Sequence, residues 1–208
     1  MSDISLFEAM RTQRSIRRYA SDPVPDELIA TIIKAATHAP SATNRQPWHF
    51  LVIRDGELKR RMSEWYVDAW SSIYPNVDPS TLPQSSRSGL ELGQGMVDVP
   101  ALILVCLDIS EERATTPSLI YGASIYPAVQ NIMLAARALG LGTVLTTIHR
   151  KHEQEIKELL RIPASVETVA LIPLGYPAEG ERFGGGKRKP VDEVTSYDRW
   201  GQHAPQGQ

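Results

Sequence analysis

The sequence predicts one α/β (α+β) domain in which helices enclose a β-sheet. The run 101–107 (ALILVCL) is apolar on both faces, which is typical of a buried strand. Segments with helical spacing of apolar residues alternate with such strand candidates along the whole chain, and this order is typical of helices packed on a sheet. The direction of the strands stays open from the residues alone.

Four elements are predicted in the first half. They are a helix over 4–12, a helix from Pro25 to about His38, a strand over 48–54 and a helix over 56–70. Proline fits the first turn of a helix, and the carboxylates of Asp26 and Glu27 favour its positive end. Residues 71–95 then contain SSIYPNVDPSTLPQSSRSG, whose prolines and serines predict a mobile, lid-like excursion.

The second half completes the same domain, which covers residues 1–208. Its predicted elements are a strand over 101–107, a long helix from Thr116–Pro117, a strand over 142–146, a helix over about 149–160 and a strand over 166–173. Pro127 should kink the long helix, and Gly140 should end it. The polar extension over about 180–208 contains Tyr197 and Trp200, so we expect it to dock against another surface.

Composition excludes several classes of function. The chain has 208 residues and a net charge of −2, which gives no reason to propose nucleic acid or an anionic membrane as a partner. No apolar run approaches the roughly 20 residues of a membrane span, and the N-terminus lacks the apolar region of a signal peptide. The single cysteine, Cys106, excludes a disulfide framework and favours a reducing, cytoplasmic location. A buried core role for Cys106 is favoured over a catalytic one.

Common catalytic motifs are missing from the sequence. No GxGxxG follows a strand, and no GxSxG nucleophile elbow occurs. His149, His152 and Glu153 could share a helical face and bind a metal ion. A solvated first turn of a helix is the favoured alternative, so no metal site is predicted.

Two basic clusters have the chemistry of a phosphate site. Arg14, Ser15 and Arg17 follow the first helix, and Arg188 lies in the KRKP segment at 187–190. A phosphate monoester carries close to two charges and is bound by guanidinium forks with hydroxyl or amide donors. The clusters suit this task if the fold brings the two ends of the chain together. The alternative for each cluster alone is a solvated surface.

A third unusual segment is APSATNRQPWHF at 39–50. It connects a predicted helix to a predicted strand, and a plain connection needs only a turn residue or two. Ser41, Asn44 and Gln46 instead supply a dense set of hydrogen-bonding side chains between two prolines. The segment is therefore predicted to be a binding loop.

Four segments occur in the order QRSIRRY, APSATNRQPWHFLVI, ALGLGTVLTT and KRKPVDEV, between about residues 11 and 200. This series resembles the nitroreductase family of FMN-dependent enzymes. The LTT and KRKP segments are similar to the branch that includes flavin-dependent dehalogenases. The resemblance implies a mixed, mostly antiparallel sheet enclosed by helices, with a C-terminal extension onto the partner subunit.

The resemblance also implies a set of FMN contacts. They are Arg14, Ser15, Ile16 and Arg17 in the first segment, Pro40, Ser41, Asn44 and Gln46 in the loop, Leu145, Thr146 and Thr147 at a strand end, and Arg188 with Lys189 or Lys187 near the C-terminus. The loop is expected to reach the flavin held mainly by the partner, so a homodimer would share its active sites. Thr146 and Thr147 would lie near the reactive N5, where an N–H or hydroxyl can stabilise charge; ordinary strand-end polarity is the alternative.

The implied activity is hydride transfer from NADH or NADPH to FMN and then to a small-molecule acceptor by a ping-pong mechanism. Nitroaromatics and quinones are the expected test acceptors, and a deazaflavin is an alternative donor. Two other hypotheses stay open: an FMN storage or sensing protein without turnover, and an interaction domain without flavin.

The sequence departs from the family pattern at two points. Thr147 replaces a Glu of some bacterial members. Glu64 and Tyr66 lack the dehalogenase spacing and no lysine occurs between 62 and 150, so amino-acid dehalogenation is disfavoured.

Overall fold

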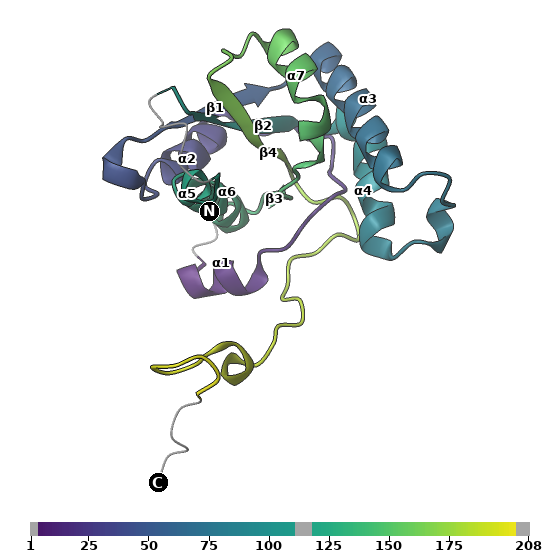
Figure 1. Cartoon of the computed structure of the whole chain (residues 1–208). Helices are drawn as coiled ribbons and strands as arrows, with labels where there is room; N and C mark the ends of the chain where they lie inside the picture. Colours follow the sequence, from purple (N-terminus) through teal and green to yellow (C-terminus); the bar gives the residue numbers. More distant parts are fainter. Residues whose placement is uncertain (1–3, 111–117, 203–208) are drawn as a thin grey trace.

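The computed structural model describes residues 4–110 and 118–202. Its centre is a four-stranded sheet in the order β1-β2-β4-β3, in which every strand pair is antiparallel (Figure 1). The strands are β1 (Trp48–Ile53), β2 (Ala101–Asp108), β3 (Gly142–Thr143) and β4 (Val166–Gly175). The α/β class and the mostly antiparallel sheet are therefore confirmed. No helix in the described ranges is long and apolar enough to cross a membrane.

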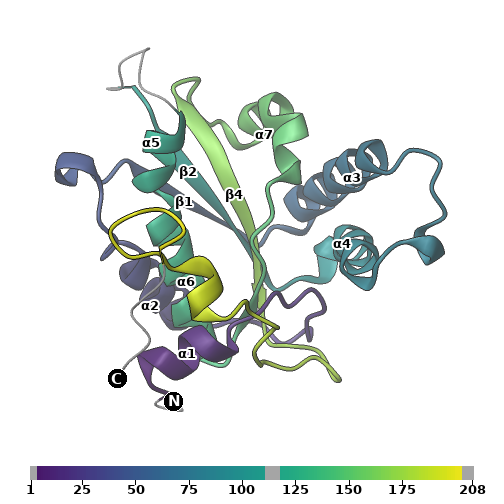
Figure 2. The ribbon, with the colours of Figure 1, turned by 60° about the horizontal axis from the view of Figure 1, so that its bottom comes forward.

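Seven α-helices within the described residues surround this sheet. They are α1 (Leu6–Thr12), α2 (Asp26–Ala36), α3 (Gly56–Ile73), α4 (Gln84–Gln94), α5 (Ser118–Ala123), α6 (Tyr126–Ala138) and α7 (Glu153–Leu160). Strand β2 is buried on both faces, so its side chains alternate between two cores. Ile103 and Val105 pack in the core that includes α2 and α6, whereas Leu102 and Leu104 pack in the core that includes α3, α4 and α7. Figure 2 shows the two groups of helices on opposite faces.

The 71–95 excursion is more regular than its composition predicts. Helix α3 continues to Ile73, and α4 then returns beside it as the second arm of a helical hairpin (Figure 2). Leu92 of α4 is buried, and Gly93 lies so close to Tyr66 that a Cβ there would be 2.7 Å from the ring. Packing on α3 thus makes a helix of a segment that reads as a loop. Its role as a lid stays a prediction.

The predicted long helix is interrupted. Its expected start at 116–117 lies outside the described residues, and the helical region after it is divided into α5 and α6 just before Pro127. Pro127 lies in the first turn of α6, where its missing N–H costs nothing, so it begins a helix instead of kinking one. Gly140 ends α6 with φ of 78°, and the N–H of Leu141 donates to the Ala136 carbonyl at 2.8 Å. Strand β3 is shorter than predicted, although Thr146 forms a further bridge to Leu171.

After β4 the chain stays hydrogen-bonded to residues 12–20 as far as Gly184, and the C-terminal segment beyond Arg188 leaves the body of the domain (Figure 1). Its residues are mostly exposed, and the side chain of Trp200 is fully exposed. Helix α1 also presents apolar side chains to solvent, because Leu6, Phe7 and Met10 are all more than half exposed. The surface on which the segment docks is therefore not found within the described part of this single chain.

Candidate functional site

The two basic clusters meet around one cavity of about 290 Å³. It is lined by Gln13, Arg14, Ser15, Arg17, Gly186 and Arg188. Backbone hydrogen bonds hold the two ends of the chain together, since the N–H of Gly184 donates to the Thr12 carbonyl at 2.9 Å. Lys187 and Lys189 are not among the lining residues. The fold therefore satisfies the condition on which the phosphate prediction depended.

Ile16 anchors this segment to the sheet. Its N–H donates to the Thr143 carbonyl at 3.0 Å, and its carbonyl accepts from the Tyr19 hydroxyl at 2.5 Å. The side chain of Ile16 is fully buried against Gly142, where an added Cβ would lie 2.8 Å from it. Both backbone groups and the side chain are thus engaged, and they aim the neighbouring Ser15 and Arg17 at the cavity.

A second cavity of about 280 Å³ lies between the segment after β3 and the α3–α4 hairpin. It is lined by Arg17, Tyr66, Trp70, Ile73, Tyr74, Ser85, Ser86, Gly89 and Val144–Ile148. Arg17 lines both cavities, so the two are neighbours at this side chain. The predicted Leu145, Thr146 and Thr147 all lie here.

The two threonines of this segment differ in what they can offer to a ligand. Thr146 is buried, and both its N–H and its hydroxyl donate to the Leu171 carbonyl at 3.0 Å. Thr147 is exposed at the cavity. Opposite them, burial raises the pKa of Tyr66 to about 12, against the opposing effect of Arg17, so this phenol stays protonated at neutral pH. Thr147 is therefore the threonine placed to meet a bound molecule.

The second cavity has three aromatic residues in its lining. From the sequence, Tyr66 was considered only as a possible dehalogenase lid residue, and Trp70 and Tyr74 were not identified. Tyr66 and Trp70 lie four residues apart on one face of α3, and Tyr74, the residue that caps the C-terminal end of this helix, follows after the same interval. The signal was present in the sequence. It was obscured because helix α3 was expected to end at residue 70 and the following segment to be irregular.

The loop over Pro40–Gln46 lies far from both cavities. The Pro47 carbonyl accepts from the Asp108 N–H at 2.8 Å, at the C-terminal end of β2. Strand β3 lies near the other end of β2, because it pairs with the part of β4 that faces Ala101. The loop is held in an unusual shape: Thr43, Asn44 and Gln46 all have positive φ, between 51° and 57°. The Ser41 hydroxyl accepts from the Gln46 N–H at 3.0 Å. Within one chain the predicted residues therefore form two separate groups.

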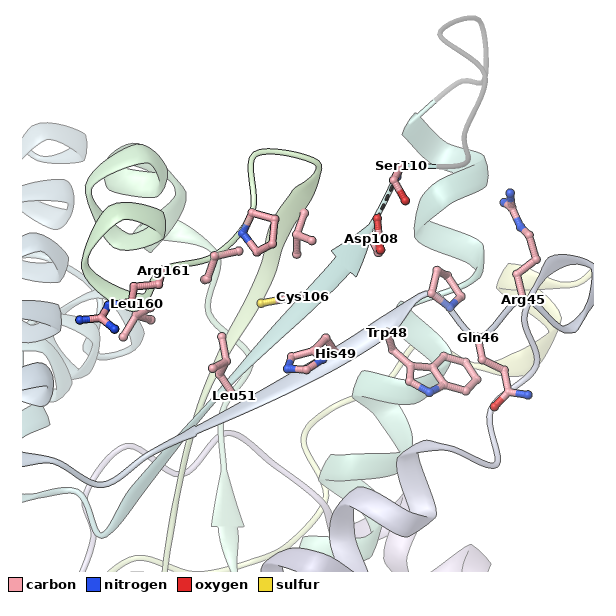
Figure 3. A pocket seen from close by; sticks show the side chains of 14 residues that line it. Arg45, Gln46, Trp48, His49, Leu51, Cys106, Asp108, Ser110, Leu160 and Arg161 are labelled. Atoms are coloured by element: carbon pink, nitrogen blue, oxygen red, sulfur yellow. Dashed lines mark hydrogen bonds between the residues drawn. The ribbon is translucent and has the colours of Figure 1, made fainter.

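A larger cavity, of about 440 Å³, lies beside this loop (Figure 3). His49 and Cys106 pair across β1 and β2 at its floor, and the guanidinium groups of Arg45 and Arg161 lie at its opposite ends. Burial raises the pKa of the Cys106 thiol to about 12, so no reactive thiolate forms near neutral pH. Cys106 is thus a core residue, as the sequence favours.

The potential metal ligands of the 149–153 segment do not converge. His149 is 1% exposed, and burial lowers its pKa to about 4. His152 instead pairs with Asp68 at 2.7 Å, and the Glu153 carboxylate accepts from the Thr168 N–H at 2.6 Å. In residues 4–110 and 118–202, no group of three or more His, Cys, Asp or Glu side chains is arranged to hold a metal ion.

Comparison with known proteins places this architecture in context. The model of the nitroreductase family matches residues 10–176. A protein of Methanothermobacter thermautotrophicus, provisionally named NADH dehydrogenase/NAD(P)H nitroreductase, is 37% identical over 182 residues, which are 86% of this chain and 81% of that protein. The iodotyrosine dehalogenase 1 homolog of Caenorhabditis elegans is 30% identical over 200 residues, 91% of this chain and 60% of the relative.

A solved structure supports the same placement at the level of the fold. Iodotyrosine deiodinase bound to FMN and 3-iodo-L-tyrosine has a TM-score of 0.75 and 24% identity, and the match covers 94% of this chain and all of the other. The family match extends over most of the chain and over both basic and loop segments on its N-terminal side. The resemblance seen in the sequence is therefore confirmed, and the chain belongs to the nitroreductase family.

Proposed function

We propose that the chain is an FMN-dependent oxidoreductase that takes reducing equivalents from NADH or NADPH. One observation carries the proposal: basic side chains from opposite ends of the sequence meet at one cavity, and Arg17 connects it to a second, aromatic cavity. A phosphate site beside a site for a flat ring system is the combination that FMN requires. The name of the Methanothermobacter thermautotrophicus relative supports the nicotinamide donor.

The donor set of the first cavity fits the FMN phosphate. Arg14, Arg17 and Arg188 supply three guanidinium groups, and Ser15 supplies a hydroxyl. Guanidinium forks form charge-assisted hydrogen bonds with phosphate oxygens, which are about twice as strong as neutral ones. Three permanent positive charges match a group that carries close to two negative charges.

The second cavity fits the ring. FMN, when bound, supplies the redox chemistry, accepting a hydride from NAD(P)H and passing reducing equivalents to an acceptor such as a nitroaromatic or a quinone in a ping-pong sequence. The residues of the chain position and tune it: Val144 to Thr147 form one wall, and the exposed Thr147 offers polar groups on that side. Arg17 places a fixed positive charge between the two cavities.

The separate position of the loop supports a homodimer with shared active sites. Ser41, Asn44 and Gln46 belong to a preformed polar loop, yet none of them lines the basic cavity of their own chain. Helix α1 and the C-terminal extension both expose apolar side chains that a partner would cover. We propose that the loop of one chain completes the site of the other, in a reducing cytoplasm.

The test is a visible absorption spectrum of the purified protein, followed by anaerobic addition of NADPH or NADH. A flavin spectrum that bleaches and returns with a nitroaromatic or quinone is the expected result. A bound flavin that neither nicotinamide bleaches would favour a storage role or a deazaflavin donor. A colourless protein that cannot be reconstituted with FMN would refute the proposal.

A further inference from the structure

The second cavity has an aromatic wall that is already assembled. Tyr66 and Trp70 are 4% and 6% exposed, and the rings of Trp70 and Tyr74 lie 4.8 Å apart at an angle of 42°. This wall faces Val144–Ile148 across the cavity. With the FMN ring placed against Val144–Thr147, as proposed above, this wall is the opposite side of the cavity, and a flat aromatic acceptor would lie between the two, because offset and tilted ring pairs are favoured at these distances.

The aromatic wall is held in place by hydrogen bonds from its side chains to Ser86 of helix α4. The indole N–H of Trp70 donates to the Ser86 carbonyl at 3.1 Å, and the Tyr74 hydroxyl lies 3.0 Å from the Ser86 hydroxyl. Gly89, on the next turn of α4, also lines the cavity and leaves room beside Trp70. The polar groups on the helical side of the cavity are thus hydroxyls, which can accept or donate a hydrogen bond but carry no charge.

The lining of the cavity carries positive charge and no negative charge among its described residues. Arg17 is the only charged side chain among its described lining residues, and none of these residues is Asp or Glu. The loop over Pro40–Gln46, which the proposed dimer would add, contributes Arg45 and also contains no acid. An ammonium group that leaves water needs a carboxylate or several acceptors to offset its desolvation, and this lining supplies no carboxylate.

We propose, on the basis of the function proposed above, that this site takes flat aromatic acceptors that are neutral or anionic and rejects acceptors that carry an ammonium group. Aromatic amino acids fall in the rejected class. The solved structure of similar fold binds 3-iodo-L-tyrosine, whose zwitterion has an ammonium group. The site of this chain therefore differs from that site in substrate class, and the hydroxyls of Ser86 and Tyr74 form the discriminating side.

Three nitrobenzenes of matched size test the proposal: 4-nitrobenzyl alcohol, 4-nitrobenzoate and 4-nitrobenzylamine, which is an ammonium ion at pH 7. Each reduction uses one hydride from NADPH and one proton, converts the nitro group to a nitroso group and releases water. We expect kcat/KM for the amine to be at least about tenfold below that of the alcohol, because a buried unpaired charge costs more than the 1.4 kcal/mol that corresponds to a factor of ten. Equal values for the three would overturn the proposal.

A charge placed on α4 gives the reciprocal test. Ser86→Asp puts a carboxylate at the cavity and keeps the backbone carbonyl that Trp70 uses, whereas Ser88→Asp adds the same charge to the same helix outside the lining. We expect S86D to raise the amine-to-benzoate ratio of kcat/KM at least about tenfold and S88D to leave it near that of the wild type. A ratio that both variants change equally would refute a role for this wall.

Failure of the proposed function has a different signature. Flavin content and bleaching by NADPH are measured first, without an acceptor, and a protein that fails there refutes the oxidoreductase proposal itself. Binding of the three compounds to the oxidised protein is then followed by the shift of the flavin absorbance, with no reductant present. A protein that is bleached normally but binds the amine as tightly as the alcohol would refute only the inference on acceptor charge.

Discussion

Replacing Arg17 by alanine tests the proposed site most directly, because this side chain lines both cavities. The substitution removes one of three guanidinium groups around the phosphate cavity and the only charged side chain among the described residues of the aromatic cavity. It leaves the backbone contacts of the neighbouring Ile16 in place, so the segment should keep its position on β3.

The expected size of the effect follows from burial. Arg17 is half-buried, so its contact with a phosphate or a ring carbonyl should have the strength of a hydrogen bond to a charged group, about 1.5–3 kcal/mol. This corresponds to a rise in the Kd for FMN of roughly 10- to 150-fold. Arg14 is exposed, where water and salt screen its charge, so Arg14→Ala should weaken binding by about 1 kcal/mol or less.

The assay is titration of apoprotein with FMN, followed by quenching of flavin fluorescence. Arg18→Ala is the matched control, since Arg18 lines neither cavity and its side chain pairs with Glu181 at 2.8 Å. The control should bind FMN like the wild type. An Arg17→Ala protein that binds FMN with wild-type affinity, or an Arg18→Ala protein that loses as much, would refute the assignment of the phosphate site.

Deleting residues 187–208 removes Arg188 and the exposed apolar side chains of the C-terminal segment. We therefore expect less flavin per chain, measured by absorbance, and a weaker dimer, measured by sedimentation. A truncated protein that stays dimeric and fully yellow would exclude this segment from the site. Gly142→Ala should lower the Tm, because the new Cβ would lie 2.8 Å from Ile16 and overpacking costs about 1–3 kcal/mol, whereas Gly56→Ala, which has open space around it, should not. His149 gives a pH dependence: burial lowers its pKa from 6.5 to about 4 in the folded state, so the unfolded chain binds this proton first as the pH falls. The contribution of neutral His149 to the free energy of unfolding is therefore complete above pH 6.5 and is lost as the pH falls towards 4. The loss is about 3 kcal/mol at 1.36 kcal/mol per pKa unit. In His149→Leu, the free energy of unfolding in urea should depend less on pH over that window.

Local patterns were sufficient for most of the fold. Apolar patterns and end signals located β1, β2, β4 and helices α1 to α3 to within a few residues. Continuous apolar runs mark the buried strands β2 and β4, and apolar residues at helical spacing mark the buried face of α2. Helix α4 was missed because its sequence, QSSRSGLELGQ, is rich in residues that favour helices weakly. Its stability comes from contacts of Leu92 and Gly93 with α3, which no local pattern contains.

The candidate site was predicted only in part, for the same reason. The types of residue indicated a phosphate site, but the meeting of Arg188 with Arg14 and Arg17 depends on long-range backbone contacts such as that of Gly184 with Thr12. The resemblance to a family supplied this juxtaposition. The aromatic wall was available as a spacing of four residues along α3 and its C-terminal cap, but the facing residues of α4 were predicted to be irregular chain.

The register of the sheet explains why one chain separates its loop from its basic cluster. Trp48 pairs with Leu107 at one end of β2, whereas Ala101, at the other end, pairs with Leu174 beside β3. Eight residues of β2 span roughly 24 Å at about 3.4 Å per residue, so the loop and the cluster lie at diagonally opposite corners of the sheet. No local motion of a buried sheet can close this distance. A twofold-symmetric partner can, because an isologous interface uses the same surfaces twice and would bring each loop to the other chain's cluster. In such a dimer FMN binds only the associated form with full affinity, so cofactor binding and dimerisation must strengthen each other.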